Sequence, residues 1–262
     1  MSPDTADGRT PYADERKTHI LDQLRAHGRV DAVDIAAGLG VTGETIRKDL
    51  IALERQGLLR RVHGGAVPLQ ALAFEPAVEA RTEFLSEKTR IARAALEHLP
   101  DQGSVLIDAG STTAKLVEQF PGDRDLTVYT NTLPLATALL TRPRLTVFSL
   151  GGRVRNKTFA EVGDWAMRAL AEINVDVAFL GTNGISLSRG LTTPDPEEAA
   201  VKRLMAGCAQ RRILLADHSK LGVISGTKHA DLHDIDLLIT DTSVTDEQCA
   251  QLERAGMRVQ RT

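Results

Sequence analysis

Residues 39–50 read LGVTGETIRKDL, and this stretch predicts a helix that begins at Thr42. The side-chain oxygen of Thr42 can cap the first turn, and Glu44 places a negative charge where the helix dipole favours one. Apolar residues then recur at i, i+4 and i+7, namely Ile46, Leu50 and Leu53. We therefore expect a helix with one apolar face that packs on a core.

The opposite face of this helix carries short or basic side chains. They are Thr45, Arg47, Lys48 and Ala52. In the major groove of DNA, Arg reads guanine, and Thr or Ala can contact the methyl group of thymine. Together with Thr42 at the helix start, Thr45, Arg47 and Lys48 are therefore our candidate DNA-binding residues on this helix.

Two segments before this helix complete a helix-turn-helix. From Asp14 onward, Ile20, Leu21 and Leu24 recur at helical spacing, and Gly28 closes the segment. The stretch DAVDIAAGLG then places Val33, Ala36 and Leu39 on a short second helix. The pattern predicts a helix-turn-helix at about residues 30–49, inside a domain of residues 13–68.

Residues 58–68, LLRRVHGGAVP, alternate apolar with basic residues around a Gly-Gly turn, which predicts a hairpin. Such a wing would lay Arg60, Arg61 and His63 on phosphates or in a minor groove. The alternative is a small packing module whose charged face is ordinary surface. From the residues alone, both interpretations stay open.

The composition is that of an ordinary globular protein, with 262 residues, 42% hydrophobic and 26% charged. The net charge of -3 argues against coating nucleic acid through bulk positive charge, and 3% aromatics are too few for base-stacking platforms. We therefore expect double-stranded DNA as the nucleic-acid partner. The polar residues 1–17 carry no apolar signal core, and no apolar run approaches a membrane span, so we expect a cytoplasmic chain with no membrane partner.

Residues 69–82 lose clear periodicity and contain Pro76, so we interpret them as a linker. In residues 83–262, short apolar runs such as SVLIDAG, VDVAFLG and DLLITD alternate with helical stretches. This rhythm predicts an α/β domain with a mostly parallel sheet covered on both faces. Ligands of such sheets bind at the carboxyl ends of the strands.

Polar residues follow five of these predicted strands. Asp108 comes first, and Gly110, Ser111, Thr112 and Thr113 then open a helix whose N-terminus can hold a phosphate. The other strand ends carry Thr130, Asn131, Gly151, Gly152, Arg153, Asn183, Asp217, Ser219 and Lys220. We expect all five to converge on one cleft, although Gly, Ser and Asn after any single strand are ordinary turn formers.

Several signatures are missing. There is no lysine-containing phosphate loop and no GxGxxG spacing, so we expect no ATP or NAD cofactor. His229 and His233 are four residues apart, as in a helical zinc pair, but no third ligand stands out, and we expect no metal. Cys208 and Cys249 stand alone, which predicts two buried thiols, and no nucleophile motif supports covalent catalysis.

The segment from Glu15 to Pro68 resembles the DNA-binding domain of the DeoR family of bacterial regulators in ILDQLRAHGRV, LGVTGETIRKDL and LERQGLLRRVHGGA. The chain from Ser86 to Val259 is similar to the sensor domain of that family in DAGSTT, TNTLPLA, VGDWAM, FLGTNGIS, GLTTPDPEEAAVK and LADHSK. Lys48 is a departure, since the family usually carries a second Arg there. Lysine keeps the positive charge but lacks the planar guanidinium with which arginine makes two hydrogen bonds to guanine.

The resemblance implies a winged helix-turn-helix and a sensor domain related in fold to ribose-5-phosphate isomerase and the CoA-transferase group. The implied effector is a phosphorylated sugar. Carried over by position, residues 110–113 would hold the phosphate, and Lys202 and Lys220 would supply positive charge. Hydroxyl contacts would come from Asp108, Asn131, Gly152 and Glu198.

The function that follows is a repressor of a sugar catabolic operon, a homo-oligomer of two or four copies rather than an enzyme. In such a dimer, two recognition helices would bind successive major grooves. The alternative makes the second domain an isomerase or deaminase, with Glu198 as general base and Lys220 as an electrostatic clamp.

Overall fold

The computed structural model describes residues 11–56, 58–62, 64–68, 72, 75 and 77–262. The chain divides into two compact units, Met1–Pro76 and Ala77–Thr262. Each unit is described by itself. Among the described residues, no helix combines the length and apolar character that crossing a membrane requires.

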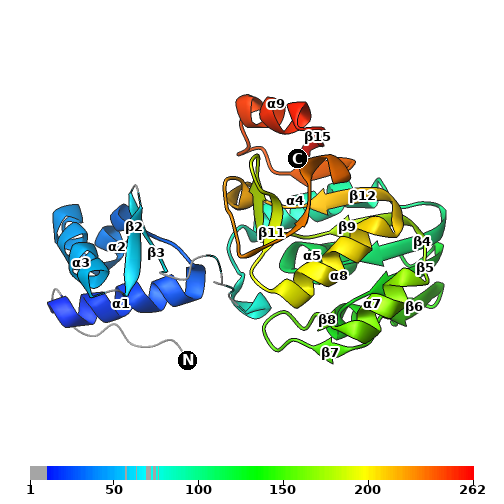
Figure 1. Cartoon of the computed structure of the whole chain (residues 1–262), viewed down its shortest axis with the longest axis horizontal. Coiled ribbons are helices and arrows are strands. Elements are labelled where there is room, and N and C mark those ends of the chain that lie inside the picture. The colour runs from blue at the N-terminus through cyan, green and yellow to red at the C-terminus, as the bar shows by residue number, and fades with distance from the viewer. Residues whose placement is uncertain (1–10, 57, 63, 69–71, 73–74, 76) are drawn as a thin grey trace. The chain divides into compact units, whose positions relative to one another are not determined.

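The first unit is a winged helix-turn-helix of three helices and a small antiparallel sheet of order β1-β3-β2 (Figure 1). Its elements in chain order are α1 (Ala13–His27), β1 (Val30–Asp31), α2 (Ala32–Leu39), α3 (Gly43–Arg55), β2 (Leu59–Val62) and β3 (Gly65–Pro68). The predicted stop at Gly28 is confirmed by its left-handed φ of 71°, and the predicted cap at Thr42 by a 3.2 Å hydrogen bond from the backbone N–H of Thr45.

The core of this unit contains the predicted apolar face of α3 together with residues from every other element. Its buried members are Ile20, Leu24, Val30, Ile35, Ala36, Ile46, Leu50, Leu53, Leu59 and Ala66. Val33, although apolar and on α2, is 71% exposed, because Ile35 and Ala36 supply the inward face of this short helix instead.

The second unit has a seven-stranded sheet of order β15-β14-β12-β9-β4-β5-β6, with every neighbouring pair parallel. The predicted α/β fold with a mostly parallel sheet is thereby confirmed. The strands are β4 (Gln102–Ile107), β5 (Asp125–Thr130), β6 (Leu145–Ser149), β9 (Val175–Leu180), β12 (Ala209–Leu215), β14 (Leu237–Thr240) and β15 (Arg258–Arg261).

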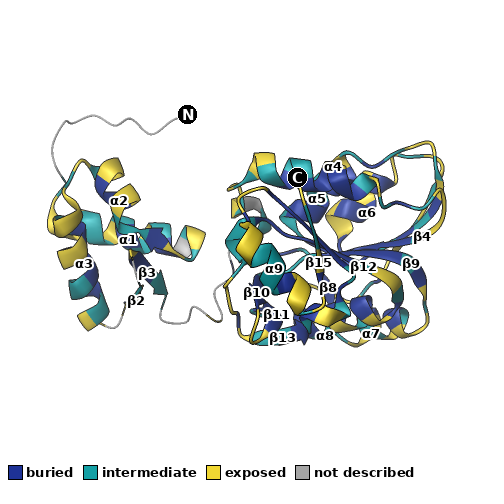
Figure 2. Ribbon diagram, turned by 90° about the horizontal axis from the view of Figure 1, so that it is seen from above, coloured by how far each residue is buried: buried dark blue, intermediate teal, exposed yellow. Residues whose placement is uncertain are grey.

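Helices cover both faces of this sheet (Figure 2). One face packs on α4 (Leu85–Leu96), α5 (Ser111–Glu118) and α6 (Leu133–Leu139). The other packs on α7 (Asp164–Ala171), α8 (Pro196–Gly207) and α9 (Asp246–Arg254). Two smaller sheets join β7 (Arg153–Val154) with β8 (Glu161–Val162), and β10 (Gly184–Ser186) with β11 (Gly190–Thr193) and β13 (Thr227–Ala230).

The strand order reverses between β4 and β9. From β4 the chain moves to β5 and β6 on one side, and from β9 it moves to β12, β14 and β15 on the other. Loops diverge at such a reversal, so the carboxyl ends of these two strands are the expected place for a ligand site.

The structure differs from the sequence-based interpretation in the assumed linker and at the His229–His233 pair. Residues 77–82, interpreted as linker, belong to the second unit and contain the 3-10 turn η2 (Val78–Ala80). His229 lies on β13 and His233 in the turn η4 (Leu232–Asp234), so the two do not share a helix face.

The two cysteines also differ from each other. Cys208 is buried as expected, and burial raises the pKa of its thiol to about 11. Cys249 is only half-buried, because it lies on the outer part of α9 rather than among the buried residues of that helix.

Candidate DNA interface and effector site

The predicted reading face of α3 is presented to solvent. Arg47 and Lys48 are exposed, and Arg47 Nη1 lies 3.2 Å from Glu44 Oε2 in a surface ion pair. Thr45 is half-buried, and its hydroxyl lies 2.9 Å from that of Thr42. The charged side chains are therefore free of the core, whereas the two threonine hydroxyls already contact each other.

An ion pair beneath this face fixes α3 on α1. Arg16 Nε donates to Asp49 Oδ2 at 2.7 Å, and Asp49 is only 6% exposed. Arg16 also donates to the backbone oxygen of Pro11 at 2.8 Å. Asp49, which lies between Lys48 and Leu50 on α3, thus helps to fix the orientation of α3 relative to α1.

The wing is joined to the recognition helix through Glu54. This carboxylate accepts hydrogen bonds from the backbone N–H of Arg61 (2.8 Å) and from Arg61 Nε (2.6 Å). The guanidinium lowers the pKa of Glu54 below its usual range. Arg60 is exposed, and His63 lies outside the described residues. Of the predicted phosphate contacts, Arg61 is therefore already paired with a carboxylate, whereas Arg60 is exposed.

In the second unit, Asp108 is fully buried directly after β4, where the strand order reverses. Its Oδ2 accepts hydrogen bonds from the backbone N–H of Gly181 (2.9 Å) and from Lys202 Nζ, and its Oδ1 accepts one from the Asn131 amide (3.4 Å). Asn131 Oδ1 in turn accepts the backbone N–H of Ala109 at 2.8 Å. The ends of β4, β5 and β9 are therefore connected through one carboxylate.

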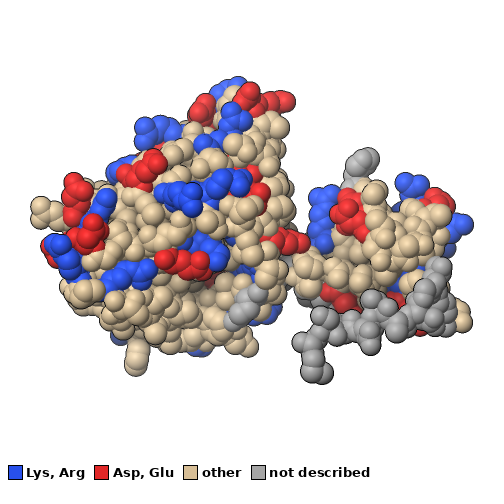
Figure 3. All heavy atoms as spheres, turned by 180° about the vertical axis from the view of Figure 1, so that it is seen from behind, with Lys and Arg blue, Asp and Glu red and all other residues tan. Residues whose placement is uncertain are grey.

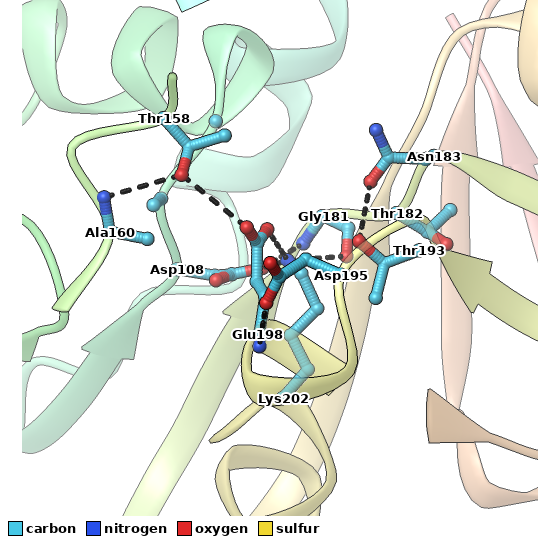
Figure 4. Close-up of polar contacts among 12 residues, drawn as sticks. Asp108, Thr158, Ala160, Gly181, Thr182, Asn183, Thr193, Asp195, Glu198 and Lys202 are labelled. Atoms are coloured by element: carbon cyan, nitrogen blue, oxygen red, sulfur yellow. Dashed lines mark hydrogen bonds and ion pairs between the residues drawn. The ribbon is translucent and has the colours of Figure 1, made fainter. Parts of the chain in front are cut away.

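Lys202 and Glu198 lie one turn apart on α8 and are both almost fully buried (Figure 4). Burial alone would lower the pKa of Lys202, but the charges of Asp108 and Glu198 outweigh burial and hold it above its ordinary value. On its other side, Glu198 pairs with Arg155, which also lies 3.1 Å from Asp195 Oδ2. The result is a buried chain of alternating charges.

Thr158 connects this chain of charges to a pocket. Its hydroxyl donates to Glu198 Oε2 at 3.3 Å and accepts from Arg155 Nη1 at 3.2 Å. Thr158 also lines a pocket of about 380 Å³ whose lining includes Gly110 and Ser111 at the start of α5. The other lining residues are Val78, Arg81, Thr82, Leu85, Ala114, Thr132, Pro134, Leu135 and Phe159.

The predicted phosphate-binding run reaches this pocket in part. Gly110 and Ser111 line it, whereas Thr112 and Thr113 are buried, and the Thr113 hydroxyl donates to the Gly110 backbone oxygen at 2.9 Å. The first N–H groups of a helix lack partners within that helix and favour an anion. The first turn of α5 therefore has the chemistry for a phosphate, supplied by its backbone and by Ser111.

Gly151, Gly152 and Arg153 contribute to a different part of the surface. The backbone N–H of Gly151 donates to buried Glu161 at 2.8 Å. Gly152 and Arg153 line a separate pocket with Glu197, to which Arg153 is ion-paired. The expectation that all five strand ends line one cleft is therefore wrong, because Gly152 and Arg153 line this second pocket and not the one beside α5.

The remaining predicted residues lie outside the pocket beside α5. Asn183 Oδ1 accepts the Thr193 hydroxyl at 3.0 Å, while the hydroxyl of Thr130 is buried with no partner among the described residues. Asp217 caps the turn η3 (His218–Lys220), where its Oδ1 accepts the backbone N–H of Ser219 at 3.0 Å. Lys220 is half-buried in the same turn.

Sequence reasoning missed Arg155, Thr158, Asp195 and Arg81. A signal existed for Asp195, because Asp before a proline at the first helical position is a helix-start pattern, and its Oδ1 accepts the backbone N–H of Glu198 at 2.9 Å. Arg155 and Thr158 lie in a hairpin loop, and Arg81 lies in the assumed linker. No periodicity marks those three positions.

Metal binding has no geometric basis in the described part of the chain, where no three His, Cys, Asp or Glu side chains are grouped to hold an ion. Lys and Arg are interspersed with Asp and Glu over the face of the second unit drawn in Figure 3. Its surface charge is thus mixed rather than of one sign.

Sequence comparisons agree with this architecture. The profile of the DeoR-like helix-turn-helix domain matches residues 16–71, and that of the DeoR C terminal sensor domain matches residues 83–242. Together, the two units define a DNA-binding transcriptional regulator with a C-terminal sensor domain.

Several relatives align over nearly their full length. The HTH-type transcriptional regulator GlpR of Haloferax volcanii is 37% identical, covering 94% of this chain and 96% of its own. The putative aga operon transcriptional repressor of Escherichia coli O157:H7 is 33% identical, with 99% and 98% covered. The HTH-type transcriptional repressor GlcR of Bacillus subtilis is 35% identical, with 95% and 96% covered. The chain belongs to the DeoR family of transcriptional regulators.

Solved structures show more distant similarity. Ribose 5 phosphate isomerase A from Neisseria gonorrhoeae has 16% identity and a TM-score of 0.39, covering 52% of this chain and 53% of its own. The probable sor operon regulator from Shigella flexneri has 12% identity and a TM-score of 0.45, covering 70% and 93%.

Proposed function

We propose that this regulator represses a sugar catabolic operon and that a phosphorylated sugar, bound beside the first turn of α5, changes its affinity for operator DNA. The observation that carries the proposal is the pocket lined by Gly110 and Ser111, adjacent to the buried charges around Asp108 and Lys202. Two relatives named as repressors support the direction of control.

The proposed roles divide the ligand between two sides. Backbone N–H groups of α5 and the Ser111 hydroxyl bind the phosphate, while Thr158, which lines the pocket, contacts a sugar hydroxyl. Asp108, Asn131 and Glu198 are buried and do not line the pocket, so they act by holding its surroundings in place. Because Asp108 and Glu198 already neutralise Lys202, this lysine acts by holding the carboxylates in place. Lys220 supplies further positive charge from η3.

On the DNA side, we propose that Arg47 reads a base in the major groove while Thr42, Thr45 and Lys48 set its approach. Arg60, Arg61 and His63 contact phosphates. The active form is a homo-oligomer in the cytoplasm, with two recognition helices on successive major grooves of a two-fold operator.

The test is an operator-shift titration with a panel of hexose and pentose phosphates, each beside its free sugar. We expect at least one phosphorylated sugar to change operator affinity about 5-fold or more while its free sugar does not. If no sugar phosphate alters binding at any physiological concentration, the sensing half of the proposal fails.

A matched pair of variants locates the phosphate. Ser111→Asp places a carboxylate where the dipole of α5 favours a negative charge, so the helix keeps its stability, but the carboxylate repels a phosphate. Ser111→Asn has nearly the same size without the charge. We expect the response to be lost in Ser111→Asp and kept at least in part in Ser111→Asn, and equal responses would place the phosphate elsewhere.

The isomerase alternative is not favoured by the geometry. Glu198, its general base, is engaged by the Arg155 guanidinium and the Thr158 hydroxyl, and the family comprises transcriptional regulators rather than enzymes. Turnover of a pentose or amino-hexose phosphate by the purified protein, lost in Glu198→Gln, would revive this alternative.

A further inference from the structure

One wall of the α5 pocket comes from the very start of the second unit. Val78, Arg81, Thr82 and Leu85 line it. These residues belong to residues 77–85, here called the entry segment, which follows in the chain directly on the unit that ends at Pro76. A ligand in this pocket would therefore touch the stretch of chain that leads to the DNA-binding unit.

Hydrogen bonds to the backbone of the entry segment attach it to the rest of the second unit. The N–H of Val78 donates to the backbone oxygen of Lys157 at 2.8 Å. Lys88 Nζ, on α4, donates to the backbone oxygens of Arg81 (3.1 Å) and Glu83 (2.6 Å), and Lys88 is only 3% exposed. Because these contacts involve backbone atoms of the entry segment, they do not depend on the identity of its side chains.

Arg81, which lines the pocket, also acts electrostatically on two buried lysines. Arg81 is half-buried, and its charge opposes those of Lys88 and Lys202, in both cases acting to lower the pKa of the lysine. Burial is the largest influence on both lysines, and carboxylates oppose it. An anion bound beside Arg81 would relieve this repulsion.

We propose that Arg81 binds the anionic group of the effector together with the first turn of α5, so that an occupied site holds the entry segment against the second unit. The pocket geometry supports this inference because Arg81 lines the same cavity as Gly110 and Ser111. Arginine is also suited to bidentate contact with a phosphate. The inference rests on the proposed function. It adds that Arg81 is the residue through which the ligand contacts the entry segment.

The first test compares Arg81→Gln, Arg81→Lys and the control Arg254→Gln, which changes an exposed arginine on α9. Calorimetry with the sugar phosphates, their free sugars and inorganic phosphate measures binding. We expect Arg81→Gln to weaken phosphorylated ligands about 10-fold or more, Arg81→Lys to recover part of the loss, and Arg254→Gln to bind normally. In the wild type alone, ligand should also slow hydrogen exchange at the N–H groups of Val78 and Arg81.

The outcomes separate this inference from the proposed function. Unchanged binding of phosphorylated sugars by Arg81→Gln overturns only the inference, as does an equal loss for free and phosphorylated sugars. If the wild type binds no sugar phosphate, the proposal of a sugar-phosphate effector is wrong. Binding of inorganic phosphate to the wild type and to Arg81→Gln then tests the role of Arg81. A wild type that binds neither overturns both.

The second test cuts one attachment of the entry segment. Val78 is the first residue of η2 and follows Ala77 with φ -56° and ψ 148°, so proline fits there. Val78→Pro removes the N–H that donates to Lys157, whereas Val78→Ala keeps it. We expect Val78→Pro to bind the sugar phosphate within about 3-fold of the wild type but to lose most of the change in operator affinity, with Val78→Ala responding fully. A full response in Val78→Pro would show that this attachment carries no signal.

Discussion

The side chain of Lys202 is only 3% exposed and lies between two carboxylates. Lys202→Met keeps the volume but leaves Asp108 buried without its cation, and breaking a buried pair in this way costs about 3–5 kcal/mol. We expect urea unfolding of the second unit to show a loss of that order. The double variant Asp108→Asn with Lys202→Met should recover part of it, because both charges are then gone. A double variant as unstable as the sum of both single variants would contradict a direct pairing.

Arg47 and Arg61 are both arginines in ion pairs, but they occupy different elements. Arg47→Ala, on α3, should weaken binding to the operator more than binding to random duplex, by about 1–3 kcal/mol, because base contacts carry sequence preference. Arg61→Ala, on β2, should weaken both DNAs alike, because phosphate contacts do not distinguish sequences. Fluorescence anisotropy with the operator and the random duplex measures both affinities. An equal loss of affinity for both duplexes in Arg47→Ala would show that Arg47 does not read a base.

A single site residue was predictable from the sequence where it lies on the exposed face of a regular element or directly after the end of one. Asp108 and Asn131 follow predicted strands, and their contact across two strand ends follows from the parallel order. Arg155 and Arg81 were not predictable, because loops have no period, and the carboxylate partners of Arg155 come from a distant segment. The partner of Arg61 was also hidden, since nothing in the sequence couples it to Glu54, seven residues earlier.

Within the first unit, the close contact of β1 with β3 depends on Gly65. A Cβ at this position would lie 1.8 Å from the backbone oxygen of Val30, so Gly65→Ala must separate the two strands. We expect a loss of more than about 2 kcal/mol in the stability of this unit. The control is Gly38→Ala on α2, where nothing lies within 4 Å and alanine should stabilise by about 0.5–1 kcal/mol. Similar melting temperatures for the two variants would exclude a steric role for Gly65.

Neighbouring strands β4 and β9 are connected near their N-terminal ends by Asp176. Its carboxylate accepts the backbone N–H (2.7 Å) and the hydroxyl (2.8 Å) of Ser104, which lower its pKa below the ordinary value. A depressed carboxyl pKa stabilises the fold above the pKa of the unfolded chain, and this stability is lost as pH falls through the folded value. Asp176→Asn should therefore unfold at lower urea than the wild type at pH 7, with the difference shrinking toward about pH 3. A difference independent of pH would attribute the effect to geometry rather than charge.

Elements as wholes follow their sequence patterns closely. Apolar spacing placed α3 and its buried face, and the runs SVLI and VDVAFL became adjacent strands β4 and β9. The β7–β8 hairpin had no such signal, because its two-residue strands are too short for an alternating pattern. The loop of that hairpin nevertheless contributes Thr158 and Phe159 to the α5 pocket, whereas Gly152 lines the second pocket.

At the scale of the whole molecule, the proposed function requires that effector binding in the sensor domain and DNA binding in the first unit are coupled. If a sugar phosphate lowers operator affinity by some factor, operator DNA must lower the affinity for that sugar phosphate by the same factor. Calorimetry with and without operator duplex checks this equality. The sequence predicted two domains and their order, but it did not indicate that the start of the second unit forms a wall of its own ligand pocket.

The ion pair between Glu54 and Arg61 has a consequence for how this molecule responds to ionic strength. Each protein cation that neutralises a DNA phosphate normally releases counterions, which steepens the salt dependence of binding by about 0.9 per contact in a logarithmic plot. When Arg61 moves to a phosphate, however, Glu54 is left to take up a cation from solution, which cancels part of that release. Glu54→Gln should therefore bind random duplex more tightly at low salt and lose that binding more steeply as salt is added. Because Glu54 on α3 competes with phosphate for Arg61 on β2, we expect the wild type to bind random DNA more weakly than Glu54→Gln and with less dependence on salt.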